Sequence, residues 1–542
     1  MTVAHSVAEI LDEHSRLCLH SIDRLYLNLY VPMLQTPAGA AWFWRQHRGH
    51  QFASSALMAP MSRRFVEHIE TFAQREGVEL VTFDKHERKE DVASESLAKF
   101  QRDEGLLFIG KAQEKAGVIR TERQRNPRTG APYAWLVKRT AMVNQYYFYG
   151  VDRDFGRFFL KFCSYFPYTG KLCINGHEYL KRQAARHGLS FAADDNCILS
   201  CDDPECLQQL ADSLTPERID RFARKWFARL PHPYPPRDRA AGFRYEISVL
   251  QAEFATTHMF DRPQTGRMLF EQLIRDNLDL GRPDRVQLIF DRRVLRRTQA
   301  RFRTRVINNG VIPSLYVDFK ANRIKQYHKL GEEYDRARRC TTRGGLRTET
   351  TINDTYDFGI GRRLENLPAL RKVGFEINQR LLHVQRIGYD CTLGEAALRQ
   401  IHSPVQLDGQ RAASLRFGDP RVLALLGAIV LFRFLPRGFR NSDLREHMAH
   451  LLGLPLELIT QGKMTYDLRR LRLHGFIERI PHSKNYRVTD FGFRASLFLS
   501  RTHARLFRPG LAVLASRDPP TPAPLRDAVL RIEQAVDRLL AA

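Results

Sequence analysis

The feature that most constrains this chain is an aromatic-rich stretch from Ala141 to Ile174. Runs rich in Tyr and Phe alternate there with short polar or glycine-containing segments such as Asp152-Arg-Asp154-Phe-Gly156. Aromatic residues favour strands, and the segments between them favour tight turns. The stretch therefore predicts three consecutive antiparallel strands.

A second group of short apolar segments lies between Val286 and Asn353 and also predicts an antiparallel sheet. The connections Asn308-Asn309-Gly310 and Lys320-Ala321-Asn322 are short enough for hairpins. The expected strands are Val286–Phe290, Arg301–Ile307, Ser314–Phe319, Arg323–Tyr327 and Leu346–Ile352. No internal repeat is evident in the sequence, but two β-rich blocks separated by helices leave a distant duplication open.

Helical patterns surround the two blocks. Apolar residues recur at spacings of three to five in residues 6–36, which predicts two helices. Residues 215–280 have a mainly helical pattern, and Leu367–Val384 predicts a long helix. The expected fold class is α+β, with an antiparallel β-sheet body and helices. More than one domain is expected, because 542 residues exceed the usual size of a single domain.

The C-terminal part changes to closely spaced helices followed by a hairpin. Three helices are expected between Val422 and Leu473, and Gly475 ends the third. A strand, a turn and a second strand then follow up to Val488. The run from Lys463 through the helix to the first strand, followed by Tyr-Arg-Val-Thr from Tyr486, resembles the winged helix-turn-helix family.

This resemblance implies DNA binding, with the third helix in the major groove, phosphates held by Arg and Lys, and bases read from the helix N-terminus. Residues 463–501 hold nine Lys/Arg against three Asp/Glu, which agrees with an anionic partner. A winged helix can instead contact a protein or serve only as a packing module. The expected nucleic-acid contacts here are Lys463, Tyr466, Arg469, Arg470, Arg472, Lys484, Tyr486 and Arg487.

These patterns divide the chain into five regions. The regions are an N-terminal α+β region (1–130), an aromatic-rich β block plus helices (131–280), a basic antiparallel sheet plus helix (281–400), the winged helix (415–510), and a proline-rich linker with a terminal helix (517–542).

Charge limits the partners of the protein. It has 85 Lys+Arg against 60 Asp+Glu, a formal net charge of +25, which is typical of proteins that bind nucleic acid.

No run of 18 apolar residues occurs, so no membrane span is expected. The N-terminus lacks the basic and apolar segments of a secretion signal, and a cytoplasmic location is therefore expected. Cysteines are thiols in that compartment, and Cys197, Cys201 and Cys206 lack the close pairing that zinc sites use.

The second β block is strongly basic. Residues 285–347 carry 17 Lys/Arg against five acids. Alternate positions of a strand share one face, so Arg301, Arg303 and Arg305 are expected on one face, with Lys325 and Lys329 placed similarly on a later strand. Such a sheet neutralises phosphates and stacks bases. The alternative is an ordinary solvated strand face.

Lys325-Gln-Tyr-His-Lys329, followed by Leu346-Arg-Thr-Glu349, resembles a pairing found in rolling-circle replication initiators of plasmids and filamentous phages. That family also has paired metal-binding histidines on a strand, which this sequence lacks, and no nicking tyrosine can be assigned. Longer motifs, such as Leu-Arg-Thr-Glu-Thr-Thr-Ile-Asn from Leu346, resemble a large group of uncharacterised bacterial proteins. That resemblance spans most of the chain and implies no function.

A metal-dependent nuclease needs carboxylates that converge on Mg²⁺. The candidates for catalysis are Asp152, Asp154 and Glu349, with His177 and Lys329 as helpers. Asp152 and Asp154 share a face if their strand is regular. In the alternative interpretation the two aspartates form a hairpin turn, and Glu349 is an ion-pair partner.

The sequence thus predicts a nucleic-acid-binding protein, in which duplex DNA is the expected partner. The first alternative is an Mg²⁺-dependent enzyme that nicks or transfers DNA strands in replication, in a mobile element or in defence. The second alternative is a structured-RNA binder. No cofactor other than a possible Mg²⁺ is expected, and the sequence does not fix the oligomeric state.

Overall fold

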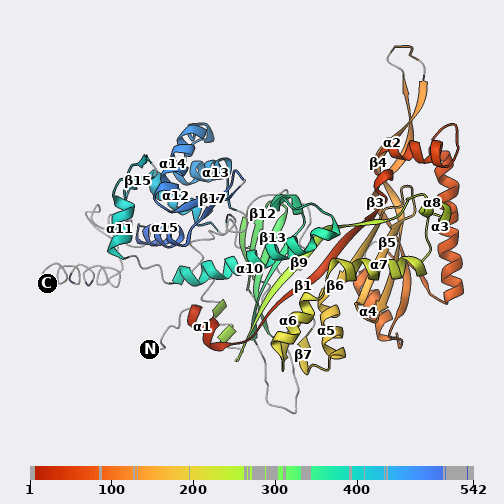
Figure 1. Cartoon of the computed structure of the whole chain (residues 1–542), viewed down its shortest axis with the longest axis horizontal. Helices are drawn as coiled ribbons and strands as arrows, with labels where there is room; N and C mark the ends of the chain where they lie inside the picture. Colours follow the sequence, from red (N-terminus) through yellow and green to blue (C-terminus); the bar gives the residue numbers. More distant parts are fainter. Residues whose placement is uncertain are drawn as a thin grey trace.

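The computed structural model describes most of the chain. The described residues are 7–84, 88–125, 128–130, 132–194, 196–261, 265–266, 269–270, 287–288, 303–308, 313–330, 344–389, 394–407, 409–431, 434, 438–481, 483–503, 507, 531 and 534. The proline-rich linker falls outside them, as does most of the terminal helix expected in 517–542. The described part is a multidomain α+β protein, as the sequence predicts (Figure 1).

One twelve-stranded sheet forms the body of the described chain. Its strands are β1 (Ser15–Tyr30), β2 (Leu80–Thr82), β3 (Gly105–Arg125), β4 (Pro132–Asp152), β5 (Gly156–Cys163), β6 (Gly170–Asn175), β9 (Glu246–Phe260), β10 (Gln287–Leu288), β11 (Arg303–Asn308), β12 (Pro313–Phe319), β13 (Asn322–Leu330) and β14 (Gly344–Ile352). The expected strands of both blocks are confirmed, including the three antiparallel strands β4, β5 and β6.

The sheet consists of two halves with the same topology. One half has the order β2-β3-β4-β5-β6-β1, and the other has the order β10-β11-β12-β13-β14-β9. In each half the short edge strand is parallel to its neighbour and the remaining pairs are antiparallel. The long strands β1 and β9 join the halves as an antiparallel pair. The chain is therefore a structural duplication, which the sequence left open.

The duplication corrects two expected boundaries. The boundary at 130/131 falls in the turn between β3 and β4, which pair along their whole lengths. The boundary at 280/281 separates β9 from its hydrogen-bonded neighbour β14. Neither position ends a structural unit, because the sheet is continuous across both.

The helices expected in 6–36 are wrong beyond α1 (Val7–His14), since the following residues form β1. Leu17 and Leu19 alternate with polar residues, and the later leucines of β1 do the same. A bulge between Ile22 and Arg24 shifts this alternation by one residue. Ile22 and Leu25 are therefore three residues apart, which is a spacing typical of a helix. β9 likewise replaces helix expected within 215–280.

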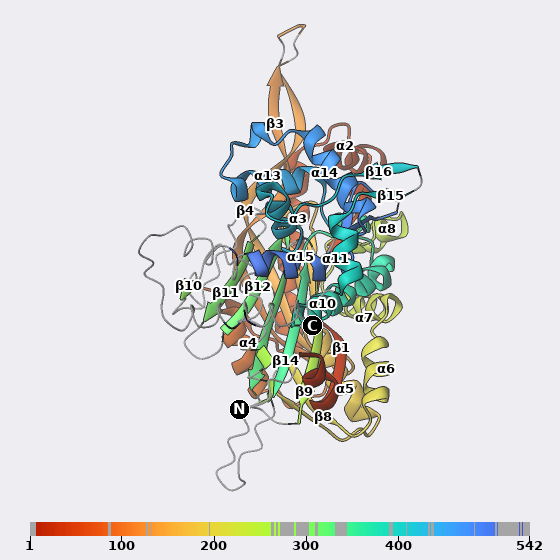
Figure 2. The same cartoon turned by 90° about the vertical axis from the view of Figure 1, so that its left-hand side faces the viewer.

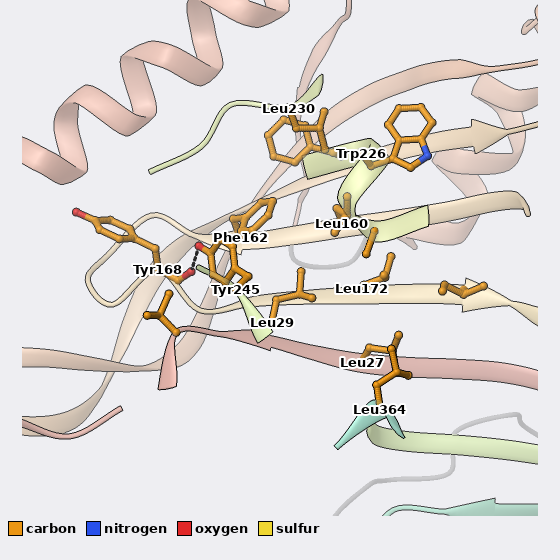
Figure 3. Close-up of a cluster of buried hydrophobic side chains, with 14 of the residues drawn as sticks. Leu27, Leu29, Leu160, Phe162, Tyr168, Leu172, Trp226, Leu230, Tyr245 and Leu364 are labelled. Carbon is orange, nitrogen blue, oxygen red and sulfur yellow. Dashed lines mark hydrogen bonds between the residues drawn. The ribbon is translucent and has the colours of Figure 1, made fainter. Parts of the chain in front are cut away.

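Helices cover one face of the sheet. They include α3 (Ser55–Glu76), α7 (Pro216–Arg229) and α10 (Leu367–Tyr389). The other described helices between α1 and residue 390 are α2 (Pro37–Trp42), α5 (Gly176–Arg186), α6 (Pro204–Asp212), α8 (Pro236–Ala240) and α4 (Lys89–Ala98), of which α4 lies on the opposite face. Leu27, Leu160 and Leu172 from adjacent strands pack there with Trp226 of α7 (Figure 3). Each buried leucine contributes about 1.5–3 kcal/mol, so this face holds the main core.

The opposite face is polar and only partly covered. Helix α4 lies over β3 and β4, and the hairpin of β7 (Phe191–Asp194) and β8 (Cys197–Cys201) approaches β1 and β14. No helix in the described part of the chain is long and apolar enough to cross a membrane.

The described C-terminal elements are α11 (Glu395–His402), β15 (Val405–Leu407), β16 (Gln410–Ala412), α12 (Pro420–Ile429), α13 (Asn441–Leu452), α14 (Gln461–Leu473), β17 (Ile477–Arg479), β18 (Tyr486–Val488) and α15 (Asp490–Thr502). They contain the three expected helices, α12, α13 and α14, followed by the expected hairpin of β17 and β18, together with elements that were not expected. Thr460 caps α14, and Gly475, at φ 77°, follows its end. The core of this unit is continuous with β12, β13 and α10, so it packs on the second half of the sheet (Figure 2).

Candidate nucleic-acid interface

The open side of the sheet carries a row of aromatic and basic side chains, which we call the polar face. Directly opposed residues of antiparallel strands share a face, and Tyr149, Phe159, Cys173 and Tyr26 are opposed in sequence across β4, β5, β6 and β1. The polar face comprises Arg24, Tyr26, Asn28, Tyr149, Phe159, Lys161, Lys171, Glu253, Tyr316, Arg323, Lys325, Tyr327, Glu349 and Thr351, all at least partly exposed.

Aromatic rings form a continuous cluster in the first half of this face. The ring centroids of Tyr149 and Phe159 are 5.4 Å apart, and those of Phe159 and Tyr26 are 6.2 Å apart. Beside them, Glu114 binds Lys161, Lys89 and Tyr147. Burial alone would raise the pKa of Glu114, but these hydrogen bonds outweigh it and lower the pKa to about 2. The cluster therefore presents flat rings flanked by cations.

Lys171 is a lysine without an acidic partner among the described residues. Its Nζ donates to Oδ1 of Asn28 at 2.8 Å. The pKa of Lys171 is lowered to about 8, mainly by burial and in part by the nearby cations Lys161 and Arg362. A phosphate bound next to Lys171 would stabilise its charged ammonium form.

Replacing Lys171 with methionine is expected to raise the free energy of unfolding at pH 7 by roughly 1–3 kcal/mol, because the charged form is disfavoured in the fold. The folded pKa of about 8 lies below the usual 10.5, so the unfolded chain binds more protons between these values. Wild-type stability therefore rises with pH over that window, and the advantage of the variant shrinks. Urea denaturation at pH 7 and pH 10 checks this, with Lys115→Met, at an exposed position, as the control that shows no gain.

The second half of the polar face carries Lys325, one of the expected basic residues of the sheet, together with Arg323. Lys325 Nζ lies 4.0 Å from the ring centroid of Tyr327, and Arg323 lies over Tyr316 at 5.6 Å. The backbone register pairs Arg303 with Asp318, Arg305 with Tyr316 and Lys329 with Gly345. Arg301 lies outside the described residues.

A buried ion network links the two halves beneath this face. Arg347 is 1% exposed and binds Asp23 of β1, Oε1 of Glu349 at 2.8 Å and Oγ1 of Thr257 at 2.6 Å. Burial raises the pKa of Asp23 to about 6, although Arg347 opposes this shift. Glu349 also accepts from the Tyr327 hydroxyl at 2.7 Å.

The three expected catalytic carboxylates do not converge. Asp152 is buried on the helix-covered side, where its Oδ2 accepts from Lys225 at 2.8 Å and from Trp226 at 2.9 Å. Glu349 instead lies on the polar face, because its neighbour Thr350 is opposite the core residue Phe254. The two carboxylates are on opposite sides of the sheet and cannot share a metal ion.

Both aspartates are held by structural partners. Oδ1 of Asp152 accepts from the backbone N–H groups of Asp154 at 2.9 Å and Phe155 at 3.1 Å, which fixes the turn between β4 and β5. Asp154 pairs with Arg186 of α5. His177, expected as a helper, is buried in α5. Among the described residues no group of three or more His, Cys, Asp or Glu could hold a metal.

Helix α14 separates a buried side from a basic exposed side. Met464, Leu468 and Leu471 are buried in the C-terminal core. The opposite side exposes Lys463, Tyr466, Arg469 and Arg472, of which Tyr466 is 52% exposed. None of these three cations has an acidic partner in the described residues, and Lys484 between β17 and β18 is exposed as well.

Three of the residues expected to contact nucleic acid have partners within the protein. Arg470 donates from Nε to the carbonyl of Ala413 at 3.0 Å and also binds the carbonyl of Ser414, so it fastens α14 to the preceding loop. Tyr486 is half-buried beside Phe439, and their ring centroids are 6.3 Å apart. Arg487 is exposed but pairs with Glu478 of β17.

A projecting hairpin is a further basic surface. β5 pairs with β4 only from Gln145 onward, so the outer parts of β3 and β4 extend as a two-stranded arm (Figures 1 and 2). Arg123 and Arg125 are exposed there without a described acidic partner, and Trp135 is 53% exposed. The equivalent pair β11–β12 is much shorter. The sequence indicates a basic turn here but not the length of the arm.

Sequence reasoning missed the aromatic row and Lys171. The available signal was the alternation in β5, where Phe158, Leu160 and Phe162 are buried while Phe159 and Lys161 point to the polar face. Comparisons of the chain with protein-family models, with curated proteins and with solved structures find no match.

Proposed function

We propose that the protein binds duplex DNA, with α14 as the principal contact and the polar face and the β3–β4 arm as further basic surfaces. The observation that carries the proposal is the exposed side of α14, where Lys463, Arg469 and Arg472 have no described acidic partner. A helix of this kind fits the major groove, where cations hold phosphates and a tyrosine can contact base edges.

The order of elements supports this proposal. Helices α12, α13 and α14 are followed at once by the β17–β18 hairpin, and Lys484 is exposed in the turn of that hairpin. This is the arrangement expected from the resemblance to winged helix-turn-helix proteins. The strand-nicking alternative has weaker support, because Asp152, Asp154 and Glu349 have separate partners. A cytoplasmic location is part of the same proposal.

The wild-type protein is expected to bind duplex DNA with a strong salt dependence. Each neutralised phosphate contributes about −0.9 to the slope of log K against log salt, so the three cations of α14 alone predict a slope near −2.7. Affinity should then fall about 40-fold between 50 and 200 mM salt. Fluorescence anisotropy with a labelled duplex measures both quantities.

Three ligands of equal length separate the alternatives: duplex DNA, duplex RNA and single-stranded DNA. Tightest binding to duplex DNA is the expected result. Tighter binding to duplex RNA would favour the RNA alternative, and a slope near zero for all three ligands would contradict nucleic-acid binding. Gel analysis of the same samples with Mg²⁺ or EDTA tests whether any strand is cleaved.

A further inference from the structure

A cavity of about 700 Å³ lies on the helix-covered side of the protein, away from α14 and from the polar face. Helix α3 forms one wall, the end of α7 and the proline-rich segment 231–236 form the opposite wall, and residues 44–50 close one end. Leu230, one of its lining residues, is drawn in Figure 3. A cavity of this size accommodates a small organic ligand.

The residues that line this cavity are basic. Five arginines and three histidines contribute to the lining, and no lining residue is an aspartate or glutamate. The arginines are Arg48, Arg64, Arg75, Arg229 and Arg239. Arg64 and Arg239 form no ion pair with any described carboxylate. The other three pair with carboxylates outside the lining, namely Asp238, Glu76 and Glu104. A concave surface that gathers five arginines, two of them without an acidic partner among the described residues, favours an anionic occupant.

Three buried N–H groups at this cavity have no hydrogen-bond partner in the protein. They are Nε1 of Trp44, Nε of Arg48 and Nε of Arg239. Trp44 is 4% exposed, and the side chain of Arg48 is 10% exposed. Buried donors nearly always find an acceptor, so three of them around one cavity indicate a ligand rich in acceptor oxygens.

The arginine at the end of the cavity is held in place before any ligand binds. Arg48 Nη2 donates to Oδ2 of the fully buried Asp238 at 2.6 Å, and His47 contacts Oδ1 of the same carboxylate at 2.8 Å. The guanidinium also lies 5.4 Å from the ring centroid of Phe43. These contacts fix the side chain, so little conformational freedom is lost when a ligand binds.

Aromatic side chains also contribute to the lining. Trp44, Phe65, Phe72, Phe227 and Tyr234 all border the cavity. Rings stack on flat heterocycles, and arginines bind phosphate with paired N–H donors. We propose that this cavity binds a phosphate-bearing nucleotide, either free or at the end of a nucleic-acid strand, with the phosphate on the arginines and the base against the rings.

Isothermal titration of the full-length protein tests this proposal with five probes. They are inorganic phosphate, a nucleoside, the matching nucleoside monophosphate, and a short single strand with and without a 5′-phosphate. The monophosphate is expected to bind saturably and more tightly than either the nucleoside or phosphate. Tighter binding of the phosphorylated strand than of the monophosphate would identify the strand end as the natural source.

The variant Arg64→Ala/Arg239→Ala is expected to weaken monophosphate binding at least about tenfold, a loss of about 1.4 kcal/mol. It removes two arginines that have no ion-pair partner, so no buried carboxylate is left unpaired. The matched control is Arg63→Ala/Arg224→Ala, which removes two exposed arginines of α3 and α7 outside the cavity and should bind like wild type.

Several outcomes would overturn the proposal: no saturable binding of monophosphate or phosphorylated strand, equal affinity for phosphate and monophosphate, or unchanged affinity in the Arg64→Ala/Arg239→Ala variant. Failure here is distinguishable from failure of duplex binding by α14. The cavity variant should retain duplex affinity, and a variant of the exposed side of α14 should retain monophosphate affinity.

Discussion

Replacing Arg347 with alanine is expected to lower the free energy of unfolding by about 3–5 kcal/mol, because it leaves buried carboxylates without their counter-charge. Arg347 is 1% exposed and bridges Asp23 of β1 and Glu349 of β14. The loss should appear in urea denaturation at pH 7 as a lower midpoint with an unchanged slope. Because these groups come from the two halves of the sheet, the variant tests whether the halves unfold together.

The pH dependence of the Arg347 variant has a defined sign. Without the guanidinium, burial acts unopposed on Asp23, and its folded pKa rises further above the usual 3.8. The folded variant then binds more protons than the unfolded chain above pH 4, so its stability falls as pH rises. The destabilisation should be larger at pH 8 than at pH 5.

The matched control is Arg323→Ala on the same face of the neighbouring strand. Its side chain is 32% exposed and pairs with Asp318 at 2.5 Å, so the loss should stay within about 1 kcal/mol. Equal losses for Arg323→Ala and Arg347→Ala would contradict a special role for the buried network.

Helices and strands that carry a local sequence pattern were predicted correctly. The strands of both β blocks and the helices α13 and α14 follow from alternation, turn residues and caps such as Thr460. β1 was missed because its bulge after Ile22 breaks the alternation. The pairing of β1 with β9 joins residues more than 200 positions apart, and no local pattern in the sequence encodes such a partner.

For the candidate site too, local sequence patterns did not indicate which residues are partners in space. Asp152 and Asp154 are two residues apart, which predicts a shared face only if the strand continues, but β4 ends at Asp152 and its carboxylate binds the following turn. The basic side of α14 was predictable, because helical periodicity fixes which residues are opposite Met464 and Leu468. The contacts of Arg470 with the carbonyls of Ala413 and Ser414 were not predictable, since these residues lie in a distant loop.

The variant Lys463→Ala/Arg469→Ala/Arg472→Ala is expected to weaken duplex DNA binding about 100-fold and to make the salt slope less steep by about 2.7, because it removes three phosphate contacts. Its free energy of unfolding should change by less than about 0.5 kcal/mol per substitution, since these side chains are exposed. Anisotropy titrations over a range of salt, with urea denaturation of the same samples, measure both.

Arg470→Ala is the informative comparison, because it removes one positive charge from the same helix but also the contacts with the carbonyls of Ala413 and Ser414. It should lower stability by about 1–3 kcal/mol while duplex affinity measured on the folded protein changes little. If the triple variant binds normally while Arg123→Ala/Arg125→Ala in the β3–β4 arm or Arg323→Ala/Lys325→Ala on the polar face does not, recognition lies on the sheet. Helix α14 would then be better explained as a contact for a protein partner, because its unpaired cations would have no measurable role on DNA.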